Sequence, residues 1–271
     1  MKPMRLEYKY LLSNSQLNEF RSSLLPFVEP DEYAANRELN EYTVRSIYFD
    51  SMNLDDYRDK IEGIKIRKKL RVRGYNEDKS DSTIFLEIKR KFENHISKNR
   101  APLKYSNLDE LLRSSDIENL IMRKKGYLHS EEDAKRFFYH YKQKTFVPVV
   151  LVVYEREAYF SKHDLTLRIT IDKNLRSLKL PGTSDLFNDN ELKRAMLNNV
   201  ILELKFFNGF PQWLQKMLTR FELQRRPLSK YTICVDNHME LKNFIVKKRL
   251  LLPDILPENV FTQKVKILKY A

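Results

Sequence analysis

Apolar and charged residues alternate along several stretches of the chain, and this period-two pattern is its clearest structural signal. Lys or Arg stands at every odd position from 65 to 73, while Ile66, Leu70 and Val72 stand at even positions. Because successive side chains of a strand point to opposite faces, this segment predicts a strand with one cationic and one apolar face. The same alternation predicts strands at residues 6–10, 84–91, 149–159, 165–172 and 200–206.

Apolar residues at three- and four-residue spacing predict a smaller set of helices. These cover residues 13–25, 107–123, 130–141 and 211–222, with a further helix over 239–245. Ser130 precedes three acidic residues and Pro211 suits the first turn of a helix, so both mark helix starts. Elsewhere the strands follow one another through turn signals such as residues 76–79, which favours an antiparallel sheet and an α+β fold.

The chain is expected to form one domain over residues 1–271. Residues 106–143 are predicted to be a helical insertion and residues 237–271 a C-terminal tail, since no repeat, linker or low-complexity segment divides the rest. There is no run of about 18 apolar residues, and the first residues lack the apolar region and cleavage site of a signal peptide. A cytoplasmic location is therefore the default expectation.

The charged faces of the predicted strands carry an excess of cations. They collect Lys9, Lys65, Arg67, Lys69, Arg71, Arg73, Lys89, Lys91, Arg156, Arg168 and Lys205, against Glu7, Glu87, Asp172 and Glu203. A charged face turned to solvent is the usual arrangement for any single strand. Like charges side by side are destabilising, however, so this many cations together indicate that a bound anion offsets them.

Two architectures fit that excess of charge: an open sheet with an exposed basic face, or a closed barrel with a cationic lumen. Closure removes exposed strand edges, and about eight strands enclose space for one ligand. The helices at residues 13–25 and 211–222 and the insertion have the apolar stripes needed to cover a barrel from outside. We therefore predict an antiparallel eight-stranded β-barrel with surrounding helices.

Composition narrows the chemistry further. The chain has 50 Lys and Arg against 37 Asp and Glu, a formal charge of +13, so its partner is expected to be nucleic acid, an anionic membrane or a phosphate chain. With only five glycines it has no Gly-rich phosphate loop, and phosphate must be held by side chains. The histidines are scattered and Cys234 is the single cysteine, which we expect to be a small buried apolar residue in a strand.

Nine short motifs occur in order between about residue 5 and residue 236. They are Glu7-Tyr8-Lys9-Tyr10, Ser46-Ile47-Tyr48-Phe49-Asp50, Leu70-Arg71-Val72-Arg73-Gly74-Tyr75, Phe85-Leu86-Glu87-Ile88-Lys89, Lys98-Asn99-Arg100, Tyr154-Glu155-Arg156, Leu167-Arg168-Ile169-Thr170-Ile171-Asp172, Leu202-Glu203-Leu204-Lys205 and Ser229-Lys230-Tyr231. Together they resemble the catalytic domain of the vacuolar transporter chaperone (VTC) polyphosphate polymerases, within the triphosphate tunnel metalloenzymes. The resemblance implies an eight-stranded tunnel, transfer of the γ-phosphate of ATP to inorganic polyphosphate, and dependence on Mn²⁺ or Mg²⁺.

The resemblance also assigns roles to individual positions. The side chains expected to line the tunnel and hold phosphates are Lys9, Arg71, Arg73, Lys89, Lys98, Arg100, Arg156, Arg168 and Lys230. Tyr154 and Ser229 would donate hydrogen bonds, Glu203 would be the metal ligand, and Glu7 and Glu87 would be secondary acidic positions that reach the metal through water. This division suits the chemistry, because arginine clamps phosphate oxygens in pairs and Mg²⁺ or Mn²⁺ prefers carboxylate oxygen. A salt bridge to a neighbouring lysine is the competing interpretation of Glu203.

Two departures from the family keep alternatives open. Pro227 stands where the eukaryotic members carry a further lysine, with Arg225 and Arg226 nearby, and the chain is expected to lack their phosphate-sensing and membrane domains. The alternatives to a polymerase are a tripolyphosphatase or nucleoside triphosphatase of the same fold, and a non-catalytic binder of polyphosphate or nucleic acid. Nucleic acid is disfavoured because aromatics such as Phe85 fall on apolar faces, and because the glutamates of the ladder would repel a phosphate backbone.

Overall fold

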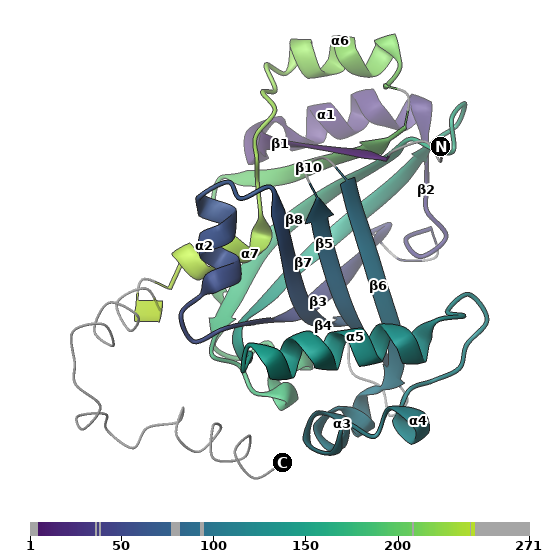
Figure 1. The fold of residues 1–271 in the computed structure, drawn as a ribbon. Helices are drawn as coiled ribbons and strands as arrows, with labels where there is room; N and C mark the ends of the chain where they lie inside the picture. Colours follow the sequence, from purple (N-terminus) through teal and green to yellow (C-terminus); the bar gives the residue numbers. More distant parts are fainter. Residues whose placement is uncertain are drawn as a thin grey trace.

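A computed structural model describes residues 5–35, 37, 39–76, 82–92, 95–207, 209–238 and 240–241 of the chain. One antiparallel sheet dominates it, with the strands in the order β1-β10-β8-β7-β3-β4-β5-β6 (Figure 1). Their bounds are β1 Leu6–Ser13, β3 Glu41–Asp50, β4 Ile66–Tyr75, β5 Thr83–Phe92, β6 His95–Lys104, β7 Val147–Ser161, β8 Arg168–Lys179 and β10 Asn199–Phe206. The short strands β2 (Val28–Pro30) and β9 (Lys193–Arg194) extend it beside β7 and β8. The predicted α+β class with an antiparallel sheet is confirmed.

Seven α-helices accompany the described part of the sheet. They are α1 Leu17–Leu24, α2 Asp55–Ile61, α3 Leu108–Ser114, α4 Ile117–Leu120, α5 Ser130–Gln143, α6 Gln212–Arg220 and α7 Lys230–Asp236. Short 3₁₀ turns lie at Asn14–Gln16, Leu25–Phe27, Tyr105–Asn107 and Thr183–Phe187. Within the described residues, no helix is long and apolar enough to cross a membrane.

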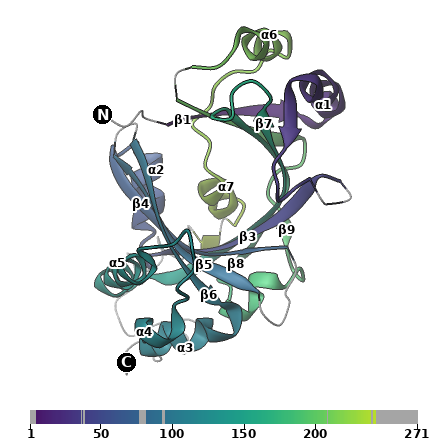
Figure 2. The ribbon, with the colours of Figure 1, turned by 90° about the vertical axis from the view of Figure 1, so that its right-hand side faces the viewer.

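The outer face of the curled sheet carries most of the apolar core. On one side Phe20 and Leu24 of α1 and Leu214 of α6 pack against β1, β8 and β10. On the other, Phe137 and Phe138 of α5 pack against β4, β5 and β6. Since helices bury the apolar face from outside, the charged face of these strands is left on the concave side, as the alternation predicts. Figure 2 shows α1, α5 and α6 outside the curve and α7 within it.

α7 closes the concave side against β3 and β7. Its residues Tyr231, Cys234 and Val235 are buried in an apolar cluster with Val150 and other residues of those strands. Cys234 is thus buried as expected, but the prediction that it lies in a strand is wrong. The Ser229 side chain caps this helix by accepting a hydrogen bond from the Thr232 N–H at 3.4 Å, and tertiary burial outweighs the β-branched composition of the segment.

Several predicted boundaries differ in the structure. The strand expected over residues 165–172 begins at Arg168 and continues to Lys179, and the helix expected over 107–123 divides into α3 and α4. The sheet also differs from a closed barrel: β1 pairs with β10 and β6 with β5, and the two strands form the ends of the strand order. Residues 77–79 of the expected turn, and most of the expected tail helix at 239–245, lie outside the described residues.

Candidate functional site

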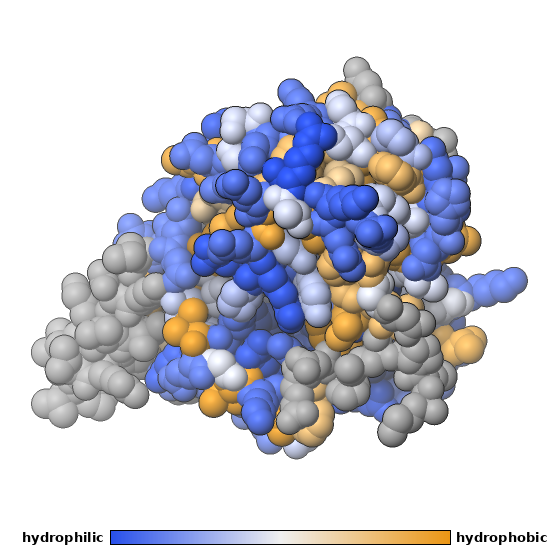
Figure 3. Space-filling view, turned by 90° about the horizontal axis from the view of Figure 1, so that it is seen from above, coloured by the Kyte–Doolittle hydropathy of each residue, from blue (hydrophilic) through white to orange (hydrophobic). Residues whose placement is uncertain are grey.

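Two cavities open along the concave face of the sheet and meet in its middle. The first chamber, of about 480 Å³, lies beside α7, and the second chamber, of about 550 Å³, lies beside the segment between α4 and α5. Both are lined by the same seven residues, which form a shared waist: Glu7, Arg71, Arg73, Lys89, Ile96, Arg156 and Lys205. Charged side chains from opposite parts of the sheet therefore converge on one pair of connected cavities. Figure 3 shows hydrophilic side chains gathered around a hollow on one face of the molecule.

The predicted site residues distribute over these two chambers. Lys9, Tyr154, Glu203, Ser229 and Lys230 line the first chamber, whereas Lys98, Arg100 and Arg168 line the second. Five more belong to the waist, namely Glu7, Arg71, Arg73, Lys89 and Arg156. Glu87 lines neither chamber. Phe85, which we expected on the apolar face of its strand, lines the second chamber, so that expectation is wrong.

Glu87 lies beneath the waist at the centre of a cationic cluster. Its carboxylate accepts from Arg71 Nε at 2.7 Å and from Arg100 Nε at 2.6 Å, and Lys98 Nζ lies 3.2 Å away. The glutamate is completely buried. Burial alone would raise its pKa, but Arg71, Arg73 and the other cations hold the pKa well below the usual value. Glu87 therefore fixes two guanidinium groups at the edge of the lumen.

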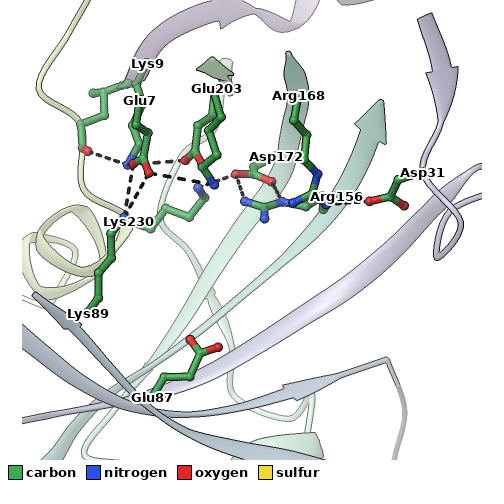
Figure 4. A network of polar contacts seen from close by, with 12 residues as sticks. Glu7, Lys9, Asp31, Glu87, Lys89, Arg156, Arg168, Asp172, Glu203 and Lys230 are labelled. Atoms are coloured by element: carbon green, nitrogen blue, oxygen red, sulfur yellow. Dashed lines mark hydrogen bonds and ion pairs between the residues drawn. The ribbon is translucent and has the colours of Figure 1, made fainter. Parts of the chain in front are cut away.

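Glu7 and Glu203 face the lumen itself. Glu7 stands opposite Lys205 and Glu203 opposite Lys9 in the pairing of β1 with β10, which makes the two carboxylates diagonal neighbours. Lys9 Nζ lies 3.0 Å from Glu7 and 3.5 Å from Glu203, and Lys205 Nζ lies 2.5 Å from Glu203 (Figure 4). Glu203 thus forms the salt bridge to a neighbouring lysine that competes with a role in metal binding.

Electrostatics keep both of these carboxylates charged. Burial and their mutual repulsion would raise the pKa of Glu7, but Lys9, Lys89 and Lys205 lower it to about 2. Burial would likewise raise the pKa of Glu203, and Lys205 and Lys9 hold it well below its usual value. Two ionised carboxylates are consequently available on one wall of a cationic cavity across the neutral pH range.

Two aspartates position further cations. Asp172 accepts from Arg156 at 2.6 and 2.9 Å and pairs with Lys230, so it links β7 and β8 to the first turn of α7. Asp31, in the loop after β2, accepts from Arg168 Nη2 at 2.6 Å. Both carboxylates are buried, and each holds its arginine in a fixed direction beside a chamber.

Among the lining residues without a role assigned from the sequence, Lys69, Tyr48 and Lys205 contact residues that have one. Lys69 donates to Ser229 Oγ at 2.7 Å and lies 4.8 Å from the Tyr231 ring centre. Burial first, and then neighbouring lysines and Arg67, lower the pKa of Lys69 well below its usual value. Tyr48 accepts from Arg71 Nη1 at 2.8 Å, and Lys205 faces both chambers. Lys69 and Lys205 lie on strands whose sequences alternate between charged and apolar residues. Tyr48 lies on β3, whose sequence does not alternate.

The acidic side chains near the waist show whether a divalent cation fits this site. No group of three or more His, Cys, Asp or Glu residues that could hold a metal occurs in the described ranges. Glu7 and Glu203 nevertheless offer two hard carboxylates beside arginines suited to phosphate. Mg²⁺ commonly binds through one or two carboxylates and completes its shell with water and substrate phosphate, so these residues fit a cation that arrives with its anion.

Comparison with known proteins places the chain in a family. Residues 4–238 match the family described as the VTC domain. The chain belongs to the VTC domain family. The predicted recognition is thereby confirmed over most of the sequence.

Individual relatives of this VTC-domain chain are more distant. It is 27% identical over 196 residues to vacuolar transporter chaperone complex subunit 4 of Schizosaccharomyces pombe, a match that covers 67% of this chain and 27% of that protein. Among solved structures, the PH1819 protein of Pyrococcus horikoshii OT3 is similar with a TM-score of 0.44 and 12% identity, covering 86% of this chain and 99% of that one. The Mimivirus capping enzyme triphosphatase has a TM-score of 0.23 and 14% identity, covering 78% and 97%.

Proposed function

We propose that this VTC-domain protein is a metal-dependent polyphosphate polymerase that transfers the γ-phosphate of ATP to a growing inorganic polyphosphate chain. The observation that carries the proposal is the waist between the two chambers, where Arg71, Arg73 and Arg156 face Glu7. The family membership and the named relative, a subunit of a vacuolar transporter chaperone complex, support the same activity. A cytoplasmic location remains part of this proposal.

Phosphoryl transfer depends mainly on positioning and charge neutralisation, which this waist supplies. Glu87 holds Arg71 and Asp172 holds Arg156, so the remaining donors of both arginines are pre-oriented toward phosphate oxygens. Lys9, Lys89 and Lys205 add point charges that a bound phosphate would draw away from Glu7 and Glu203. The two freed carboxylates would then hold Mn²⁺ or Mg²⁺, and the bound cation would neutralise charge on the transferred phosphoryl group.

The waist also favours one phosphoryl acceptor over another. A terminal phosphate of the chain, lying beside the γ-phosphate, competes with water for the same phosphorus atom. Phosphates that fill the waist between Arg71, Arg73 and Arg156 would displace the water that otherwise reaches this point. Transfer to the chain is therefore proposed over hydrolysis.

Product analysis tests the proposal. Purified protein is incubated with ATP labelled in the γ-phosphate and Mn²⁺, and the products are separated by size on a gel. Labelled chains of many phosphates, formed together with ADP, are the expected result. Free phosphate as the sole labelled product, formed together with ADP, would assign the protein to the triphosphatases, and binding of ATP without turnover would make it a non-catalytic binder.

A further inference from the structure

Lys69 of β4 is a lysine of the first chamber that bonds to a serine instead of a carboxylate. Four other lysines that line this chamber form ion pairs with glutamate or aspartate: Lys9, Lys89, Lys205 and Lys230. In the described part of the chain, Lys69 Nζ has no carboxylate within ion-pair distance. Its contacts are Ser229 Oγ at 2.7 Å and the ring of Tyr231, whose centre lies 4.8 Å away. The chamber wall therefore contains a lysine without a counter-charge.

The surroundings of Lys69 are set for an anion. Lys69 stands opposite Lys89 in the pairing of β4 with β5, and like charges at directly opposite positions are unfavourable. Burial first, and then Lys9 and Lys89, lower the pKa of Lys69 well below its usual value. A phosphate in the chamber has the opposite effect, because a negative charge nearby favours the ammonium form. Phosphate binding and the charge of Lys69 thus support each other.

The hydroxyl oxygen of Ser229 accepts hydrogen bonds from two sides. Lys69 Nζ donates to it at 2.7 Å, and the Thr232 N–H donates to it at 3.4 Å. A hydroxyl has two lone pairs and one hydrogen, so these two bonds use its accepting capacity. An ammonium group only donates, so a charged Lys69 cannot accept the hydroxyl hydrogen in return. That hydrogen is left for another acceptor, and Ser229 lines the chamber in which an acceptor can bind.

The backbone at Ser229 is held from both sides by other contacts. Lys9 Nζ donates to the Leu228 carbonyl at 3.3 Å, and Lys230 forms an ion pair with Asp172. These contacts come from β1 and β8, whereas Lys69 belongs to β4. The position of the serine backbone therefore does not depend on Lys69. What Lys69 adds is the direction of the hydroxyl group.

We propose that Lys69 is a positioning residue of the phosphate site, which holds the Ser229 hydroxyl so that its hydrogen is donated to a phosphate oxygen in the first chamber. The inference rests on the proposed function for the identity of the ligand, and it gives a role to a residue that had none. Donation from a cation to the hydroxyl oxygen also polarises the O–H bond, which strengthens the hydrogen bond that the hydroxyl donates.

Capping of α7 is the competing explanation for Ser229. A cap needs only the bond from the Thr232 N–H, which is the longer of the two. The shorter bond, from Lys69, comes from a distant strand and takes no part in the cap. If Ser229 were only a cap, its replacement would have the same effect with and without Lys69. The two explanations therefore differ in a measurable way.

A double-mutant cycle measured by calorimetry separates positioning from capping. Tripolyphosphate is titrated, in metal-free buffer at one pH, into the unmodified protein, Ser229→Ala, Lys69→Met and the variant with both changes. With Lys69 present, Ser229→Ala should weaken binding about tenfold, as expected for a hydrogen bond to a charged group. In Lys69→Met, the same change should weaken binding less than about threefold, because the hydroxyl has lost its fixed direction. The loss of the cap occurs in both backgrounds and cancels.

Lys60→Met is the matched control for the loss of charge. Lys60 lines the same chamber, and among the described contacts it has no bond to Ser229, so Ser229→Ala should still cost about tenfold in this background. Ser229→Thr keeps both the hydroxyl and the cap, and it should bind tripolyphosphate within about threefold of the unmodified protein. Lys69→Arg keeps a cationic donor and should recover most of the affinity that Lys69→Met loses.

Equal losses on Ser229→Ala with and without Lys69 would overturn the proposal, and so would unchanged tripolyphosphate binding in Ser229→Ala alone. A reduced effect of Ser229→Ala in Lys60→Met would also overturn it, because general loss of charge would then explain the coupling. The cycle is repeated with Lys69→Gln, so that the result does not depend on the folding of one variant.

The cycle measures binding without turnover, so its outcome is separate from the product analysis. Polyphosphate formed by a protein without this coupling would remove only the role of Lys69. Coupling in a protein that forms no polyphosphate would remove only the polymerase activity.

Discussion

Glu87 and the pair Glu7–Glu203 are acidic groups in the same cationic space, yet their surroundings differ. Glu87 is enclosed by Arg71, Arg100 and Lys98 and reaches neither chamber, whereas the pair contacts lysines and faces the lumen. Guanidinium groups in fixed two-point contacts are hard to displace, while lysine ammonium groups move easily to another anion. The difference indicates one carboxylate that builds the site and two that can change partners when ligand binds.

The largest expected effect is the loss of Glu87. Glu87→Gln leaves Arg71 and Arg100 without their buried counter-charge, which should lower the free energy of unfolding by about 3–5 kcal/mol. Urea denaturation measures the loss. The control is Glu132→Gln on α5, an exposed pair with Arg136, which should cost less than about 1 kcal/mol. Similar stabilities for the two variants would remove the structural role of Glu87.

Glu203→Gln is expected to act on turnover instead. The substitution keeps the size of the side chain and removes a metal-binding charge, so metal-dependent turnover should fall by roughly a hundredfold or more. Tripolyphosphate binding in metal-free buffer should persist, because one repulsive charge has gone. Thermal unfolding close to that of the unmodified protein would show that the fold is retained; normal turnover would contradict the assignment of Glu203.

Arg71 belongs both to the buried cluster around Glu87 and to the waist, because it pairs with Glu87 and lines both chambers. Arg71→Ala should therefore weaken tripolyphosphate binding by about tenfold or more, given the usual worth of a hydrogen bond to a charged group. Turnover should fall in parallel. Arg113→Ala, an exposed residue of α3, is the control for removing one positive charge. If both variants bind tripolyphosphate equally well, Arg71 is not a phosphate ligand.

The smallest effect concerns pH. Burial, with smaller contributions from Arg100 and the neighbouring arginines, lowers the pKa of Lys98 to about 7, against the opposing pull of Glu87. Because the pKa of Lys98 is lower in the folded protein than in the unfolded chain, the folded protein loses this proton first as pH rises. The contribution of Lys98 to the free energy of unfolding therefore increases as pH rises above 7. Its attraction for an anion, in contrast, falls as pH rises through 7.

Tripolyphosphate titrations between pH 6 and pH 8 measure this change. The affinity of the unmodified protein should drop by a few-fold more than that of Lys98→Met, because the ligand's own protonation is the same in both experiments. Identical pH profiles for the two proteins would mean that Lys98 keeps its charge or takes no part in binding.

The sequence predicted much of the sheet because polar and apolar residues alternate wherever one face is charged. β3 was not predicted because both of its faces are buried, one under α5 and the other under α7. Its sequence therefore does not alternate between polar and apolar residues. β6 is an edge strand that contains Pro102 and many polar residues, which weakens its signal. α7 has a strand-like composition and becomes a helix through its cap and its packing.

The candidate site shows the same division between local and long-range information. Arg71, Arg73, Lys89 and Glu203 follow from strand alternation and from family resemblance, and the structure brings them to one cavity. The contact of Asp31 with Arg168 joins residues 137 positions apart, and no local pattern indicates it. Glu87 lies on the predicted face of its strand, but longer cationic side chains fold over it, which alternation alone does not reveal.

The central claim is that the concave face binds one phosphate chain at the waist with a cation at Glu7 and Glu203. A crystal structure of the protein with tripolyphosphate and Mn²⁺ tests it most directly. The account predicts phosphates in contact with Arg71, Arg73 and Arg156, and Mn²⁺ bound by the Glu7 and Glu203 carboxylates. Tripolyphosphate bound only to outer lysines, with both chambers free of anion and metal, would contradict it.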